Sequence, residues 1–127
     1  MIAIAAVAMS GCASPWTCNL DPIFAQVDVI NVVGGVKVTS QMVGVVKPLL
    51  GDQWLTSSEP TLTVWRHPSG PAITRRLATD GRFSLSLPRG RYCYVATANG
   101  FYATTGRVVV TKSAPSRPLT VLLAIAN

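Results

Sequence analysis

Few side chains in this sequence could perform catalysis or hold a metal ion. His67 is the single histidine, and a catalytic triad or a zinc site would need partners for it at ligand spacing, which are missing. No HExxH, CxxC, P-loop or glycine-rich dinucleotide motif is present. We therefore expect no enzymatic activity, no metal site and no cofactor. The five acidic residues are Asp21, Asp28, Asp52, Glu59 and Asp80.

The cysteines suggest covalent attachment instead. The chain starts with an apolar run that ends in small residues, and Met9-Ser10-Gly11-Cys12 resembles the lipobox of bacterial lipoproteins. This resemblance implies a signal peptide over residues 1–11, a lipidated Cys12, and a tether over residues 12–25. No Lys or Arg precedes the apolar run, and a start codon assigned too far downstream would explain that. The alternative is an apolar N-terminal strand or helix inside a cytosolic fold. The run is too short for a transmembrane helix, which needs about 20 residues.

The lipoprotein resemblance also implies a location. A lipidated Cys12 would attach the protein to a membrane of the cell envelope. In a Gram-negative cell, Ala13 after the cysteine would direct the protein to the outer membrane, on its periplasmic face or at the cell surface.

With Cys12 carrying lipid, Cys18 and Cys93 remain as an even pair in an oxidising compartment, and we expect them to form a disulfide. Cys93 alternates with Tyr92 and Tyr94, so it faces outward if the tyrosines face the core. The N-terminal segment could then be linked to the outside of a sheet. The alternative is two free thiols.

Basic and aromatic residues are the candidate ligand contacts. The net charge is +6, and a surface rich in arginine could bind lipopolysaccharide, anionic lipid or nucleic acid, although no basic run predicts specific nucleic-acid binding. The alternative is a solvated outer face. Trp54 would be a lid over the core or an exposed contact, and an outward-facing Trp65 would pack under a neighbouring loop or stack on a sugar. The predicted contacts are Trp54, Trp65, Tyr102, Arg75 and Arg76.

Alternating polarity predicts strands in the second half of the chain. Phe83, Leu85 and Leu87 share one face of a strand that follows the turn dipeptide at residues 80–81. Residues 88–90 end this strand, and a further strand leads to a second turn at residues 99–100. We expect three or four antiparallel strands joined by short loops here.

The first half is rich in valine and predicts strands over residues 26–33 and 36–47, divided at Gly34-Gly35 by a hairpin turn or a bulge. Residues 61–66 alternate again, and residues 73–79 are expected to form a further strand. The apolar segment 119–124 is expected to be buried on both sides or to pair centrally.

The motif T-D-G-x-F-x-L-x-L-P-x-G-x-Y, followed by N-G-F-Y, resembles the carboxypeptidase regulatory-like domains, also called transthyretin-like or prealbumin-like, and is similar to the Cna B-type repeats. The resemblance covers roughly residues 60 to 125. It implies an antiparallel β-sandwich of about seven strands with Greek-key topology, and we expect this domain over residues 26–127. The residues that carry it are Thr79, Asp80, Gly81, Phe83, Leu85, Leu87, Pro88, Gly90, Tyr92, Gly100 and Phe101.

Together these observations predict a membrane-anchored envelope lipoprotein. Its sandwich would act without catalysis, as a binding or structural module for another envelope or secreted protein, through an exposed edge strand or a loop. Two alternatives are a carbohydrate-binding module that uses exposed aromatic residues and a basic protein that binds an anionic surface.

Overall fold

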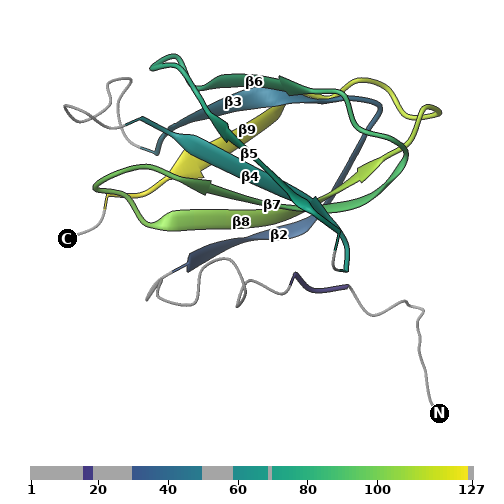
Figure 1. Ribbon diagram of the computed structural model, residues 1–127, viewed down its shortest axis with the longest axis horizontal. Helices are drawn as coiled ribbons and strands as arrows, with labels where there is room; N and C mark the ends of the chain where they lie inside the picture. The colour runs from purple at the N-terminus through teal and green to yellow at the C-terminus, as the bar shows by residue number, and fades with distance from the viewer. Residues whose placement is uncertain (1–15, 19–29, 50–58, 69, 126–127) are drawn as a thin grey trace, which may run out of the picture.

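The computed structural model describes residues 16–18, 30–49, 59–68 and 70–125, which contain strands and no helix. The strands form two sheets that face one another (Figure 1). The larger sheet has the order β2 (Ile30–Thr39), β8 (Ala103–Val110), β7 (Gly90–Thr97), β4 (Thr61–Arg66) and β5 (Ala72–Arg76). The smaller has the order β6 (Arg82–Leu85), β3 (Met42–Pro48) and β9 (Leu119–Leu123).

One hydrophobic core fills the space between the sheets. Leu62, Tyr92 and Tyr94 point into it from the larger sheet, and Phe83 and Leu85 point into it from the smaller one. The predicted alternation is therefore confirmed, and the fold is an all-β, sandwich-like one. The core also contains Met42, Val46, Val64, Leu77, Ala96, Ala98, Val108, Val110, Leu119, Val121 and Leu123.

The sheets are mixed, which corrects the expectation of a purely antiparallel sandwich of about seven strands. The described residues form eight strands, β2 pairs with β8 in parallel, and β3 pairs with β9 in parallel. Both parallel pairs arise in the same way. The chain crosses from the larger sheet to the smaller one after β2 and again after β8. The two crossings run side by side in the same direction, so the strands before them and the strands after them both pair in parallel.

Thr39 joins these two crossings. Its hydroxyl oxygen accepts hydrogen bonds from the backbone N–H of Gln41 (3.3 Å) and of Arg117 (2.9 Å). Its carbonyl oxygen accepts one from the N–H of Thr111 at 3.0 Å. The Thr39 side chain is fully buried, so these bonds satisfy polar groups that water does not reach. The crossing at Ser40–Gln41 also divides the strand that we expected over residues 36–47.

The glycine pair at 34–35 is a bulge and not a hairpin turn. β2 continues through both glycines, its register against β8 shifts between Val32 and Val36, and Gly35 has a φ of 77°. Glycine adopts this backbone conformation without a Cβ clash.

Two further expectations about pairing are wrong. Strand β6 pairs with β3, not with β5 or β7, because the chain changes sheets on both sides of it. Strand β9 lies at the edge of the smaller sheet with only one face buried, so its apolar sequence does not mark a central strand. The turns at residues 80–81 and 99–100 are present, with Gly81 at a φ of 71° and Gly100 at 89°.

Candidate functional site

The outer face of the larger sheet carries a second apolar cluster, built from Trp65, Cys93, Val95 and Ala103. These residues alternate along β4, β7 and β8 with the residues of the main core. Trp16 and Cys18 pack against the cluster from outside. We call residues 16–18 the strap, because they cover the sheet at this point and bury an apolar surface that solvent would otherwise reach.

A disulfide attaches the strap to the sheet. Cys18 and Cys93 are bonded with an S–S distance of 2.09 Å and a Cα–Cα distance of 5.9 Å, across 75 residues of sequence. The predicted pairing and the outward direction of Cys93 are confirmed. Closing a loop of this length stabilises the fold by about 4 to 5 kcal/mol in the chain-entropy treatment.

Trp16 is held by contacts that the sequence analysis missed. Its ring lies 4.7 Å from the His67 ring, centroid to centroid, and 5.8 Å from Cζ of Arg107. Arg107 also donates hydrogen bonds to the carbonyl oxygens of Trp16 (2.8 Å) and Gly35 (3.2 Å). The available sequence signal was the position of Trp16 two residues before Cys18, since this spacing places both side chains on one face of an extended segment.

His67 lies next to the strap, but it is not part of a catalytic group in the described residues. Its Nδ1 atom is buried and has no hydrogen-bond partner there. The described carboxylates, Glu59 and Asp80, lie before β4 and before β6, at the other end of the strands. Within the described ranges no group of three His, Cys, Asp or Glu residues could hold a metal ion.

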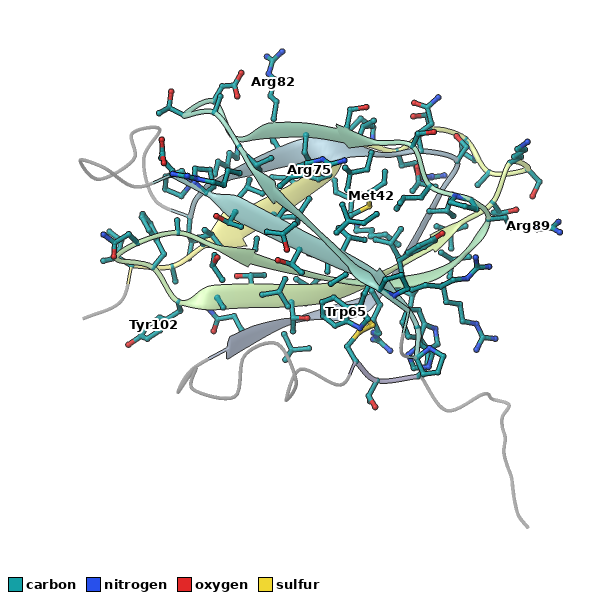
Figure 2. All side chains as sticks on the ribbon, in the orientation of Figure 1. Met42, Trp65, Arg75, Arg82, Arg89 and Tyr102 are labelled. Atoms are coloured by element: carbon teal, nitrogen blue, oxygen red, sulfur yellow. A yellow bond between two sulfur atoms is a disulfide. The ribbon has the colours of Figure 1, made fainter. Side chains whose placement is uncertain are left out.

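The predicted ligand contacts do not converge on one surface. Trp65 is only 3% exposed and lies beneath the strap, which is the packing explanation for its outward direction. Tyr102 is half-buried and lies at the far end of the larger sheet, about 16 Å along β8 from Arg107, the residue level with Trp65 (Figure 2). Trp54 lies outside the described residues, as does the lipidation site Cys12.

The two predicted arginines lie on the edge strand β5. Both Arg75 and Arg76 are exposed, and Arg76 forms an ion pair with Glu59. Arg75 is opposite Leu62 in the register of β4 and β5. Neither arginine lies beside Tyr102 or Trp65, so the four described candidates do not form a common stacking or anion-binding platform.

Other basic residues gather at the end of the molecule where β4 ends and β7 begins. The guanidinium of Arg66 donates to the carbonyl oxygen of Arg89 at 2.7 Å, and the carbonyl oxygen of Arg91 accepts the N–H of His67 at 2.9 Å. Arg89 and Lys112 line one surface groove. Arg117 lies nearby, bonded through its backbone N–H to Thr39. We call Arg66, Arg89, Arg91, Lys112 and Arg117 the basic end.

Comparison with models of known protein families gives no match for this chain, and comparison with curated protein sequences gives none either. In the described part of the chain, no helix has the length and apolar character that spanning a bilayer requires.

Proposed function

We propose that this protein is a lipid-anchored protein of the cell envelope, whose sandwich-like domain binds or supports another envelope or secreted protein without catalysis. The observation that carries the proposal is the Cys18–Cys93 disulfide. Such bonds persist in oxidising compartments outside the cytosol. The bonded Cys18 lies six residues after Cys12, the residue whose preceding sequence resembles a lipobox.

The proposal includes the finer fold class, a transthyretin-like Greek-key sandwich of the carboxypeptidase regulatory-like kind. Its support is local. The turns around Gly81 and Gly100 fall where the motif places them, and Phe83, Leu85 and Tyr92 point into the core as the motif requires. A solved structure would support this fold class for the chain only if it also contained the parallel pairs β2–β8 and β3–β9.

Of the surfaces that the structure describes, the edge strand β2 is the one best suited to bind a protein partner. Among the described strands it is the longest, it lies at the edge of the larger sheet, and Lys37 is its only charged residue. Val32 is 72% exposed and Val38 is 44% exposed. An exposed edge with apolar side chains can accept an added strand from another chain.

The other edges offer less. Strand β5 presents the exposed, charged Arg75 and Arg76, which oppose strand addition. Strand β6 has four residues. Strand β9 is partly covered, because the hydroxyl of Thr104 donates to the carbonyl oxygen of Leu122 at 2.8 Å.

The intact mass of the protein from the membrane fraction of its host tests the anchor. We expect a mass that corresponds to an acylated chain starting at Cys12, and loss of both processing and membrane association in Cys12→Ser. Alkylation without prior reduction should modify neither Cys18 nor Cys93. An unprocessed, unacylated chain in the soluble fraction would refute the anchored-protein proposal.

A photoreactive residue at position 38 tests the partner edge in the same host. We expect a discrete cross-linked adduct that Val32→Lys abolishes, because a charge on β2 opposes strand addition. The matched control is Thr74→Lys, which places the same charge on the exposed edge strand β5. Equal adduct yields from the two lysine variants would rule out β2 as the binding edge.

A further inference from the structure

The strap enters the fold at the basic end. The Trp16 ring lies against the His67 ring at a tilt of 42°, and His67 follows Arg66 in the chain. The backbone N–H of His67 donates to the carbonyl oxygen of Arg91. Figure 1 shows residues 16–18, in purple, beneath the larger sheet, and Figure 2 shows Arg89 at the end of the molecule where β4 ends and β7 begins. The first described residue of the chain therefore lies beside the cluster of cations.

This position limits how far the basic end can lie from a lipid anchor. Trp16 lies four positions after Cys12, so an extended chain between them spans at most about 14 Å. Trp16 cannot move freely, because the Cys18–Cys93 bond and the hydrogen bond from Arg107 hold the strap on the sheet. The Debye length at physiological ionic strength is about 8 Å. The limit of about 14 Å is less than two Debye lengths, so the tether allows charges beside Trp16 to come within range of the headgroups of the membrane that holds Cys12.

The charge at this end has one sign. All five residues of the basic end are exposed, and the two described carboxylates, Glu59 and Asp80, lie beyond the opposite ends of the strands. Among the described residues, Arg76 and Glu59 form the one ion pair. The cations of the basic end are thus not neutralised by any described acidic side chain, and a guanidinium group matches the geometry of a phosphate.

We infer that the basic end docks on a bilayer that contains anionic phospholipid, next to the point where the tether leaves the membrane. The orientation of the domain relative to the bilayer rests on the proposed lipidation of Cys12. A lipid anchor and a basic patch reinforce each other, because each adds a separate favourable contribution to membrane binding. Docking in this way would direct the turn at residues 80–81 away from the membrane and leave the β2 edge accessible from the side.

A bilayer fits this end better than a nucleic acid or a glycan. Bases and sugars are held largely by stacking on aromatic side chains. Among the described residues of this end, no aromatic side chain is fully exposed. Tyr92 and Trp65 are buried, and the Trp16 and His67 rings are half-buried against each other. What remains exposed is positive charge, which suits a surface of phosphate headgroups.

Sedimentation with vesicles tests the inference without the acyl chain. The full-length Cys12→Ser protein is mixed with vesicles of phosphatidylcholine alone or with added phosphatidylglycerol. We expect binding only to the anionic vesicles, and loss of binding as salt approaches about 1 M, where the Debye length is about 3 Å. The triple variant Arg89→Gln, Arg91→Gln and Lys112→Gln should bind about a hundredfold more weakly, since each cation near the surface contributes about fivefold.

A second triple variant provides the matched control. Lys47→Gln, Arg75→Gln and Arg82→Gln remove the same number of arginine and lysine charges from exposed positions outside the basic end. We expect less than about a tenfold loss of binding, which reflects net charge alone. Equal losses in the two triples, equal binding to neutral vesicles, or binding to a soluble polyanion but not to vesicles would each overturn the inference.

Acetylation of lysines in the acylated protein tests the orientation. On anionic vesicles, Lys112 should react several-fold more slowly with a water-soluble reagent, while Lys47, near the other end of β3, should keep its reactivity. Protection of Lys47 instead would overturn the inference. The mass measurement separates the two proposals. An unacylated native chain that still binds anionic vesicles would refute the anchor and leave the docking surface. An acylated chain in which Lys112 and Lys47 are labelled equally on anionic vesicles would refute only the docking surface.

Discussion

The guanidinium of Arg107 donates a 2.8 Å hydrogen bond to the carbonyl oxygen of Trp16, and this bond joins residues that are 91 positions apart in the sequence. Arg107 lies on β8 directly opposite Cys93, the residue that carries the disulfide to Cys18. A covalent bond and a charged hydrogen bond therefore hold the strap at neighbouring points of one sheet face.

Arg107→Gln should loosen the strap without unfolding the sheet. The substitution removes a charge-assisted bond to Trp16, and such bonds contribute about 1.5 to 3 kcal/mol. We expect faster hydrogen exchange at Thr17 and a modestly lower urea midpoint. Arg91→Gln is the control, because Arg91 is exposed and also lies in the larger sheet. Similar exchange at Thr17 in both variants would show that Arg107 does not hold the strap.

Loss of the disulfide should destabilise the fold more than Arg107→Gln does. Cys18→Ala with Cys93→Ala removes the constraint on a 75-residue separation, and we expect the free energy of unfolding to fall by about 4 to 5 kcal/mol. Trp65 fluorescence should shift toward that of an exposed indole as the strap leaves. The same double variant treated with reductant should change no further, whereas the unaltered protein should. A midpoint unaffected by the double substitution would contradict this role.

Local patterns in the sequence predicted which side chains face the core, and they also predicted the disulfide. Phe83 and Leu85 alternate with polar residues, and the placement of Cys93 between two tyrosines fixed its direction once the tyrosines were assigned to the core. Both directions follow from a period of two within one strand, which needs no knowledge of neighbouring strands. The pairing itself followed from the even number of cysteines that remain after Cys12.

Strand partners could not be predicted in the same way, because pairing depends on contacts between distant segments. The turn at residues 80–81 has the composition of a hairpin turn, yet it carries the chain from one sheet to the other. The crossing at Ser40–Gln41 has no Gly or Pro to mark it. The gathering of Arg66, Arg89 and Arg117 was hidden for the same reason, since β4, the loop before β7 and the loop before β9 meet only in the folded chain.

The bonds of Thr39 predict that its hydroxyl is needed at the sheet crossings. Thr39→Val keeps the shape of the side chain but leaves the N–H groups of Gln41 and Arg117 without this acceptor. We expect a loss of about 1 to 3 kcal/mol, because both N–H groups lose the acceptor that the fully buried Thr39 side chain provides. Thr39→Ser keeps the hydroxyl and should lose less than half as much. Chemical denaturation compares them, and equal losses would assign the effect to packing.

Glycine is required at position 44 by the close approach of two backbones. A Cβ atom added there would lie 2.1 Å from the carbonyl oxygen of Leu119, the residue opposite in the parallel pair β3–β9. Gly44→Ala should therefore destabilise the fold by about 1 to 3 kcal/mol or more. Gly34→Ala is the matched control, since a Cβ there meets nothing within 4 Å. A melting temperature for Gly44→Ala no lower than that of Gly34→Ala would refute the close approach.

The folded protein should lose stability at high pH through one buried tyrosine. Burial raises the pKa of Tyr94 from 10.0 to about 12 in the folded protein. Between these values the unfolded chain has released the phenolic proton and the folded chain still holds it, so stability falls as pH rises. The two-unit difference corresponds to a loss of about 2 to 3 kcal/mol. Tyr94→Phe should remove this component from urea midpoints measured between pH 10 and pH 12, while the loss caused by other groups remains. Parallel pH profiles for the two proteins would show that Tyr94 does not titrate in this way.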